Sequence, residues 1–492
     1  MSTTVWTGSN GNWTDPTWSD GVPDAALDAI IAGTSSSPDT VTFDTASGAA
    51  HSLTMTFATL AVAGGTLTLE TSSVLDSVDQ TSGLLDFAAG GTISGPVVQT
   101  AGAIEIDSGT LLLQSADNRL NGTLSGNGEL EIAAGATVDT THLTTEGGLT
   151  IEDAGKMGLS AGTISGTGTL AIAAAGTFVG DGTLEESAIK NSGKLIAASG
   201  GTLTLDGPVT GSGTLIAYGA LDFEGVGSVI TSKIIGPSLI EFSGGSTTID
   251  PGTSGVNVKD VELTGSATLT MGLSVAYNGV FTDDASATGT VFDLADHKVD
   301  FRHASFTGSS GSSALIDGGG ALINTGTMTL NGAALDGGTG LSNSKLVTQT
   351  GSVALGAPSG GNGSIVNQAG ATYDIAGAVS LSAASATTDT IENAGLFAKT
   401  GSGTAVIGAA FTNIGTIEVT SGTLEITAAF TNTGTIIGTQ MQSNGTTFIT
   451  APSASVFNQY ATAMDPVGGT GALTTSLPNH LSAPMLAAPH SG

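Results

Sequence analysis

The chain has 492 residues, with 42 acidic and only 10 basic side chains, so its formal net charge near neutral pH is −32. Because a field of that sign repels phosphate groups, we expect it to bind neither nucleic acid nor an anionic membrane surface. The chain has no cysteine, which excludes disulfides and thiolate metal sites, and no apolar run reaches the ~18 residues of a transmembrane helix.

The first segment, residues 1–38, contains all three tryptophans of the chain, Trp6, Trp13 and Trp18. A stack of repeats exposes an apolar cross-section at each end, so we expect these indoles to form an N-terminal capping unit. The segment resembles the N-terminal opening unit of large secreted β-helical proteins of proteobacteria, many of which are autotransporter-like or adhesin-like. Residues 1–8 have neither a basic region nor an apolar run, so we expect no secretory signal peptide at this end.

Residues 39–450 are dominated by a repeat. Residues 409–417 return as residues 428–436, a shift of 19 with one change, and segments such as 66–69 alternate aliphatic with polar side chains. A period of about 20 residues, with short half-buried strands between Gly or Asn corners, indicates a chain wound into a solenoid. We therefore predict an all-β fold, a right-handed parallel β-helix of about 20-residue coils, because parallel crossovers strongly favour that hand.

A second pattern, Asn-x-Gly before an aliphatic strand, marks corners of the solenoid. It occurs at Asn191, Asn324, Asn393, Asn413 and Asn432, and in the last two copies, with Gly415 and Gly434, it extends to Asn-x-Gly-Thr-Ile. Gly and Asn tolerate the left-handed backbone region better than other residues, so we expect sharp turns at these corners. Asparagines stacked on successive coils can also hydrogen-bond to one another.

Residues 451–492 lose the repeat. Ser453 and Ser455 favour a short helix that ends at Pro466, and the remaining tail carries no charge after Asp465. The stretch from Phe457 to the end resembles the uncleaved C-terminal region of alphaproteobacterial proteins released by type I secretion. This resemblance implies an export signal at the C-terminal end.

The densest group of ionisable residues lies at 293–303. Strand alternation would place one set on one side, His297, Val299 and Phe301, and another set on the other, Asp296, Lys298, Asp300 and Arg302, with Asp283 and Asp284 half a coil earlier. A β-helical polysaccharide lyase or glycoside hydrolase needs such groups to meet in one groove. A solvated, salt-bridged strand face needs no convergence, and we favour it, so we predict no catalytic and no cofactor-binding residues.

Calcium binding is the one metal question that the sequence leaves open. Proteins that leave by type I export often carry Gly-Gly-x-Gly-x-Asp repeats that bind calcium between turns. The nearest match, residues 360–364, lacks the required Asp. We therefore name no metal ligands and keep only scattered calcium binding by an acidic surface as an expectation.

Together these features and resemblances favour a non-enzymatic protein that is secreted, extracellular or at the cell surface. Its expected role is that of an adhesin, a surface-layer component or a biofilm-matrix component that presents a rigid rod to a glycan or a cell surface. Because the end of such a rod exposes unpaired strand edges, we also expect self-assembly head-to-tail into filaments. The alternative is the β-helical lyase or hydrolase.

Overall fold

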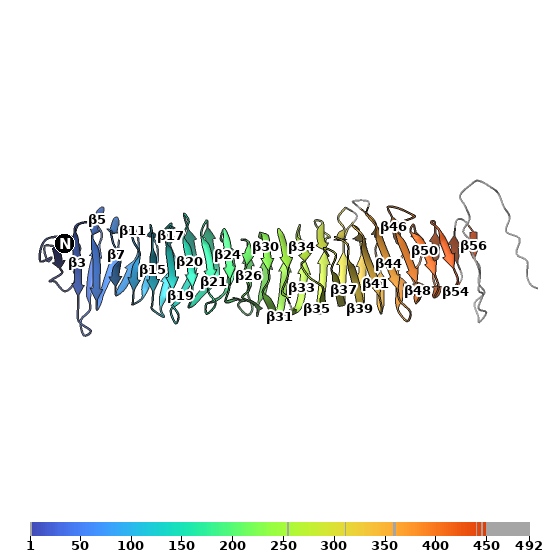
Figure 1. Cartoon of the computed structure of the whole chain (residues 1–492), viewed down its shortest axis with the longest axis horizontal. Coiled ribbons are helices and arrows are strands. Elements are labelled where there is room, and N and C mark those ends of the chain that lie inside the picture. The colour runs from blue at the N-terminus through green and yellow to red at the C-terminus, as the bar shows by residue number, and fades with distance from the viewer. Residues whose placement is uncertain are drawn as a thin grey trace, which may run out of the picture.

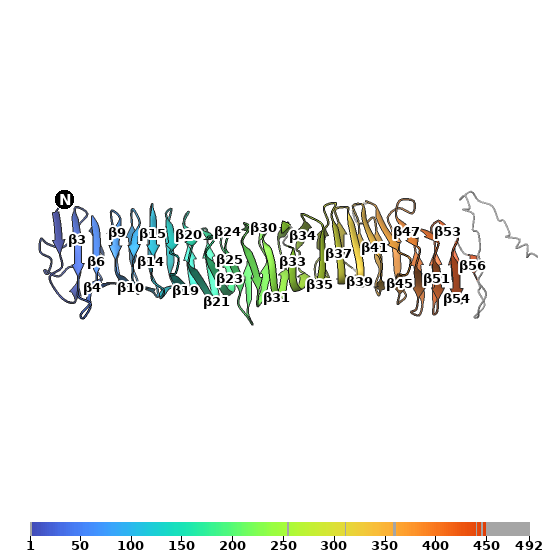
Figure 2. The same cartoon turned by 60° about the horizontal axis from the view of Figure 1, so that its bottom comes forward.

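The computed structural model describes residues 2–252, 255–309, 311–357, 361–438, 440–443 and 446–448. In these residues the backbone forms strands, β1 to β56, and no α-helix. The strands stack along one elongated rod (Figure 1), and the turned view shows the same single file of coils (Figure 2). The helix expected near Ser453 and the tail of residues 451–492 lie outside the described residues.

Each coil contributes strand to three faces, which we call face 1, face 2 and face 3. In one coil these are β9 (Ser73–Leu75), β10 (Ser77–Gln80) and β11 (Leu84–Phe87). In the next coil Gly91, Val97 and Ala103 lie opposite Ser73, Val78 and Leu84, and all three pairings are parallel. The structure thus confirms a parallel β-solenoid of about 20 turns.

Face 1 consists of an 11-stranded and a 12-stranded sheet. Its strands are β1 Ser2–Val5, β3 Leu27–Ala32, β6 Ser52–Thr56, β9, β12 Gly91–Ile93, β15 Thr110–Leu113, β18 Glu129–Ile132, β20 Thr150–Asp153, β22 Thr169–Ile172, β24 Ala188–Asn191, β27 Val209–Thr210, β30 Val226–Ile230, β32 Ser246–Ile249, β34 Thr268–Met271, β36 Thr290–Asp293, β38 Ala314–Asp317, β40 Ala333–Leu335, β43 Val353–Leu355, β46 Ser380–Ala383, β49 Thr404–Ile407, β52 Thr423–Ile426, β55 Met441–Ser443 and β56 Thr446–Phe448. The two sheets meet where Val209 N donates to Ser228 Oγ at 3.0 Å.

Faces 2 and 3 belong to one 33-stranded sheet. Face 2 contains β2 Gly11–Asn12, β4 Asp39–Phe43, β7 Ala58–Val62, β10, β13 Val97–Gln99, β16 Asn118–Leu120, β25 Lys194–Ala197, β28 Thr214–Ala217, β41 Thr339–Asn343, β44 Gly363–Asn367, β47 Thr390–Asn393, β50 Ala410–Asn413 and β53 Phe430–Asn432. Face 3 contains β5 Ser47–Ala50, β8 Thr66–Leu69, β11, β14 Ala103–Ile106, β17 Thr123–Gly126, β26 Thr202–Leu205, β29 Ala220–Phe223, β42 Leu346–Gln349, β45 Thr372–Ile375, β48 Leu396–Lys399, β51 Thr416–Val419 and β54 Thr435–Gly438. Long strands that continue from face 2 into face 3 are β19 Thr137–Thr145, β21 Lys156–Gly166, β23 Thr177–Glu185, β31 Lys233–Phe242, β33 Val256–Leu263, β35 Val275–Asp284, β37 Lys298–Thr307 and β39 Ala321–Asn331.

The core is a narrow column of aliphatic side chains that stack in register. On face 3, Leu67, Leu85, Ile104 and Leu124 follow one another on successive coils, and each is at most 1% exposed. Period-2 alternation turns the residues between them outward, as a strand with one buried face requires. Sequence alternation therefore decides which side chains meet the core and which form the surface of the rod.

The N-terminal end of the rod is closed. Trp13 is 1% exposed and packs edge-to-face on Trp18 and Phe43, with ring centroids 5.3 and 6.0 Å apart. Residues 17–21 lie along the outer edge of β1, where Ser19 N donates to Val5 O at 2.9 Å. The tryptophans and this segment together cover the first coil.

The last described strands close face 1 at the other end. β55 pairs parallel with β52, and β56 then folds back antiparallel on β55, with Met441 opposite Phe448. A strand in the opposite direction ends the parallel stacking of this face. At the N-terminal end, Trp6 and Trp18 form an antiparallel bridge, so both ends of face 1 carry an antiparallel segment within the described residues.

Candidate functional site

Six buried asparagines form a ladder at the ends of the face 2 strands. They are Asn324, Asn343, Asn367, Asn393, Asn413 and Asn432, none more than 2% exposed. Each Nδ2 donates to Oδ1 of the next asparagine at 2.8, 2.8, 2.7, 2.6 and 2.7 Å in turn. Nδ2 of Asn343 also donates to Thr372 O at 2.8 Å, and that of Asn367 donates to Leu396 O at 2.9 Å. The ladder therefore ties successive coils together through their interior.

Four ladder members, Asn324, Asn393, Asn413 and Asn432, are among the asparagines selected from the sequence. Asn343 and Asn367 were missed because no Gly follows two residues later. A better signal is an apolar residue, any residue and then Asn at the end of a strand, as in residues 341–343 and 365–367. Asn191 follows the same rule but lies on face 1, where its Nδ2 donates to Thr214 O at 3.3 Å.

The corner glycines have a different role from the expected one. Neither Gly415 nor Gly434 has a positive φ, so the expectation of a left-handed backbone was wrong at both. A Cβ on Gly415 would lie 2.3 Å from Gly395 O, and a Cβ on Gly434 would lie 2.1 Å from Gly415 O. Close approach of successive backbones therefore explains these glycines.

The ionisable stretch at 293–303 does not converge on a groove. Val299 and Phe301 are buried, while Lys298 is exposed on face 2 and Arg302 is exposed at the corner between faces 2 and 3. His297 was expected beside Val299 but is half-buried in the corner before β37, where its N donates to Leu294 O at 2.8 Å. The structure therefore gives this stretch the arrangement of a solvated strand face.

The two aspartates that precede this stretch, Asp283 and Asp284, do not lie beside its charged residues. Asp283 points into the core at a position that Leu263 and Phe306 hold in the adjacent coils, and it is fully buried. Thr290 Oγ1 donates to its Oδ1 at 2.5 Å, and Oδ2 has no partner. Burial raises the pKa of Asp283 to about 7. Asp284 lies at the surface, where its Oδ1 accepts a hydrogen bond from Ser286 N at 3.0 Å. The acidic and basic residues that an enzyme would need in one groove therefore do not meet.

The sequence analysis also missed other buried ionisable groups, of which Asp153 and Lys399 are two examples. Asp153 ends β20 in register with Ile132 and Ile172, and burial raises its pKa to about 7. Lys399 is fully buried and its Nζ donates to Gly401 O. Burial lowers the pKa of Lys399. Aligning successive coils would have found Asp153, because its neighbours in register are apolar.

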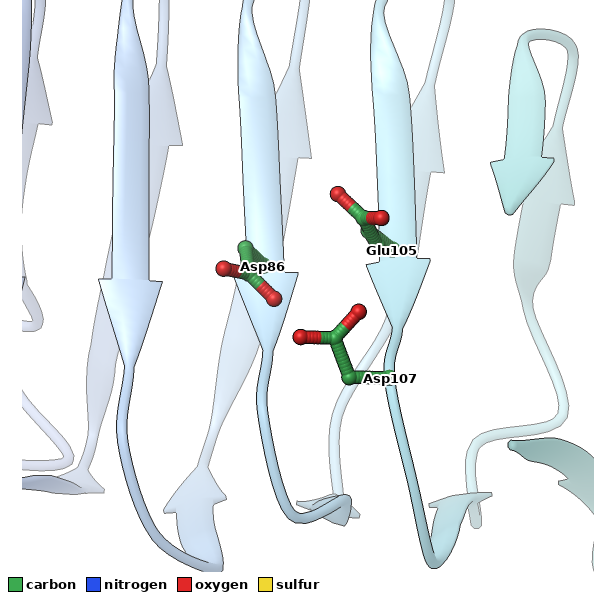
Figure 3. Close-up of side chains that lie close together, drawn as sticks. All are labelled: Asp86, Glu105 and Asp107. Carbon is green, nitrogen blue, oxygen red and sulfur yellow. The ribbon is translucent and has the colours of Figure 1, made fainter. Parts of the chain in front are cut away.

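One group of three carboxylates lies together on face 3: Asp86, Glu105 and Asp107 (Figure 3). Asp86 and Glu105 are opposite one another on β11 and β14, and oxygen atoms of all three residues lie within 4.8 Å. Partial burial, followed by the charge of Asp107, raises the pKa of both Asp86 and Glu105. Exposed acidic groups of this kind are common without an ion, so we assign no metal site here.

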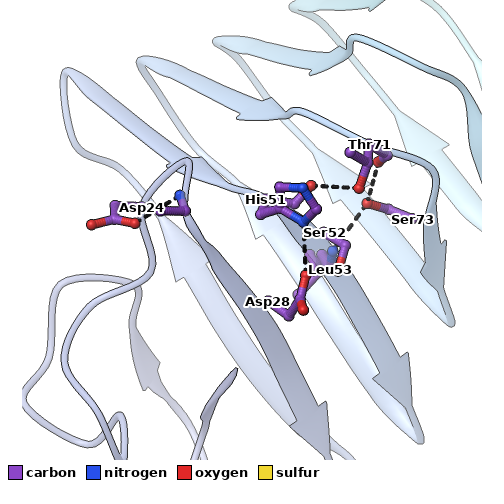
Figure 4. Close-up of polar contacts among 8 residues, drawn as sticks. Asp24, Asp28, His51, Ser52, Leu53, Thr71 and Ser73 are labelled. Carbon is purple, nitrogen blue, oxygen red and sulfur yellow. Dashed lines mark hydrogen bonds and ion pairs between the residues drawn. The ribbon is translucent and has the colours of Figure 1, made fainter. Parts of the chain in front are cut away.

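His51 and Asp28 form a pair at the corner between faces 3 and 1 (Figure 4), with His51 Nδ1 2.9 Å from Asp28 Oδ1. Ser52 Oγ donates to the same oxygen at 2.7 Å, and this contact, followed by that of His51, lowers the pKa of Asp28. Such a pair orients a histidine in hydrolases that also hold a nucleophile. Here the nearby hydroxyls of Thr71 and Ser73 donate to the backbone carbonyls of His51 and Thr71. The group therefore connects coils.

The described residues contain no helix that is long and apolar enough to span a membrane. Comparisons of the chain with protein families, with curated proteins and with solved structures give no match.

Proposed function

We propose that this chain is an extracellular structural and adhesive protein that offers the side of a rigid rod to a glycan, a cell surface or further copies of itself. The observation that supports the proposal is a row of small polar side chains on the outside of four successive coils, with Glu262 and Asp374 in register at its two ends. On face 3, Thr282, Ser305, Thr329 and Thr348 follow one another in register on successive coils. Groups in adjacent coils are about 4.8 Å apart.

Repetition is what gives such a surface adhesive strength. One hydroxyl contributes little to binding, but many weak contacts on one rigid body raise the overall affinity because each contact holds the next close to its partner. The hydroxyl row also avoids the repulsion that a row of like charges would create at this spacing. A long polar rod is therefore suited to extended partners.

The ends of the rod favour contacts along its sides. Because residues 17–21 cover the outer edge of β1, and β56 covers β55, both ends of face 1 lack an open parallel edge. Natural proteins use such coverings to prevent edge-to-edge pairing. We therefore propose that association is mainly lateral, and we keep head-to-tail contact through faces 2 and 3, whose last described strands are β53 and β54, as the second mode. No observation favours the lyase or hydrolase alternative.

The test is electron microscopy of the purified full chain with and without calcium, combined with retention on immobilised polysaccharides and on cells. We expect rods on the order of 100 Å long, aligned side by side in bundles or sheets or retained on a glycan or cell surface. Dispersed rods that are retained on nothing would contradict the proposal. Release of new reducing ends or unsaturated sugars from a polysaccharide would instead establish the enzyme.

A further inference from the structure

A shallow polar trough lies on face 2 around Arg119. Two hollows of about 320 and 300 Å³ adjoin there and share Arg119 and Asp139 in their walls. Val98 and a second carboxylate, Asp117, border the first hollow, and Asn121, Thr141 and Ser160 border the second. These residues come from β13, from the β16 coil, and from β19 and β21, so the trough crosses four coils, or about 14 Å along the rod.

Arg119 is an unusual group on this surface. It is one of only two arginines in the chain, and it lies in register between Val98 and Asp139. Among the described residues no carboxylate oxygen comes within 4.0 Å of its guanidinium, although the chain has 42 acidic residues. An exposed cation without an ion-pair partner is available to a ligand.

The position of Asp139 is consistent with an unpaired Arg119. Asp139 has Arg119 on one side and Gly158 on the other in the ladder of strands. A Cβ built on Gly158 would lie 2.6 Å from Asp139 Oδ1, so the missing side chain leaves the space that the carboxylate occupies. The trough therefore presents one cation, Arg119, together with two carboxylates, Asp139 and Asp117, neither of which forms an ion pair with it.

The rim of the trough is held in place by Asn121. Its Oδ1 accepts from Thr141 N at 2.8 Å and from Thr141 Oγ1 at 3.1 Å. These contacts span the register shift between Thr140 and His142, where the β19–β21 ladder is irregular. Bulges of this kind redirect side chains next to binding sites. Thr141 is thereby fixed with oxygen lone pairs available at the edge.

We propose that this trough binds a saccharide that carries a carboxylate, such as a uronic acid unit of a polysaccharide. The guanidinium fork of Arg119 matches the two oxygens of a carboxylate. Asp139 accepts hydrogen bonds from ring hydroxyls, Thr141 and Ser160 add hydroxyl contacts, and Val98 offers an apolar surface to a ring face. The inference rests on the proposed adhesive function and names the ligand class and one place where it binds.

The overall charge of −32 determines whether long-range attraction or short-range contacts hold such a ligand. It repels a polyanion at long range, but salt screens charges beyond about 8 Å at physiological ionic strength. Recognition therefore depends on the contacts within the trough. Asp139 and Asp117 disfavour a more compact, doubly charged group such as phosphate beside Arg119, because each carboxylate would repel it more strongly than it repels a single carboxylate.

The test measures binding of a trigalacturonate and of its carboxyl-reduced counterpart to the full chain by calorimetry or ligand-observed NMR. We expect the acidic sugar to bind about tenfold or more tightly than the reduced one, and Arg119→Gln to remove this preference. Arg302→Gln is the matched control, because Arg302 is the other arginine and is exposed in β37 at the corner between faces 2 and 3, outside the trough. It should leave affinity within about twofold, since screening weakens a distant charge.

Equal affinity of the wild type and the Arg119→Gln variant for the acidic sugar, or no binding by the wild type, would overturn the inference. Circular dichroism of the variant checks that the rod is intact. If wild-type rods bundle or adhere to surfaces and yet ignore the acidic sugar, only the trough assignment fails. If they neither associate nor adhere, the proposed function fails as well.

Discussion

Two neighbouring regions of the rod differ in how their buried polar side chains are hydrogen-bonded. The ladder segment, residues 321–432, repeats asparagine at one interior position for six coils, and each side chain is hydrogen-bonded to the next. The aromatic segment, residues 246–307, places Asp283 between Leu263 and Phe306. A solenoid satisfies an interior polar group when neighbouring coils carry the same group, and otherwise the group loses hydration without a matching partner.

Packing differs between the two regions as well. In the aromatic segment Phe281 lies 4.6 Å from Phe301, 5.1 Å from Phe292 and 5.6 Å from Phe306, measured between ring centroids. Next to this cluster is an apolar cavity of about 40 Å³. In the ladder segment Tyr373 and Phe397 stack with ring planes 1° apart. The following rings of the ladder segment are tilted, with Phe397 and Phe411 at 56° and Phe411 and Phe430 at 54°. The cavity, and not ring orientation, therefore marks the aromatic segment as incompletely packed.

The largest expected effect concerns Asp283 and pH. Burial raises its pKa from 3.8 to about 7, so the folded state holds the proton more tightly than the unfolded chain. Its contribution to stability is complete below pH 3.8 and is lost as the pH rises to about 7. Asp283→Asn keeps an acceptor for Thr290 without a charge, and should lessen this loss by about 4 kcal/mol.

The measurement is thermal or denaturant unfolding between pH 4 and pH 8, with hydrogen exchange in β35 and β36 as the local readout. Asp284→Asn is the control, since that carboxyl is at the surface and its hydrogen bonds to Ser286 lower its pKa. It should not reduce the loss. If the unfolding free energies of the wild type and Asp283→Asn fell in parallel as the pH rises, the pKa of Asp283 would not be raised by burial.

The next largest effect is expected inside the asparagine ladder. Asn367→Ala removes the acceptor of one N–H of Asn343 Nδ2, whose other N–H still donates to Thr372 O, and it removes the Nδ2 donor to Asn393 Oδ1, both in buried positions. Two orphaned polar groups should destabilise this part of the rod by about 3 kcal/mol. Hydrogen exchange of β41 to β50 measures it, and Gln368→Ala, a change at the exposed neighbour, should have little effect. Equal protection in the two variants would mean that the ladder contributes no stability.

The repeat itself could be predicted because each of its features lies within a short stretch of sequence. Alternation at residues 66–69 and the return of residues 409–417 at 428–436 identify strands, period and stacking without any knowledge of distant contacts. Asp283 shows the limit of such reasoning. Alternation from Phe281 places it inside, but charged residues are expected outside, and only the neighbouring coils decide which rule holds.

The trough around Arg119 could not be predicted for a related reason. It depends on the register shift after Thr140, on the space above Gly158 and on the position of Asn121 one coil earlier. None of these features has a pattern within a single coil. Asn343 and Asn367 were within reach, however, because a strand-final Asn two residues after an apolar residue recurs in coil after coil.

The smallest expected effect uses the same substitution in both regions. Val275 lines the 40 Å³ cavity of the aromatic segment, so Val275→Ile has room for its methylene and should stabilise the rod by about 0.8 kcal/mol. Val347 is fully buried and lies opposite Met328 and Tyr373 in the ladder segment. Val347→Ile should therefore overpack and destabilise by about 1 kcal/mol. Unfolding of both variants under one condition gives the two signs, and stabilisation by both would mean that the ladder segment is packed no more tightly than the aromatic segment.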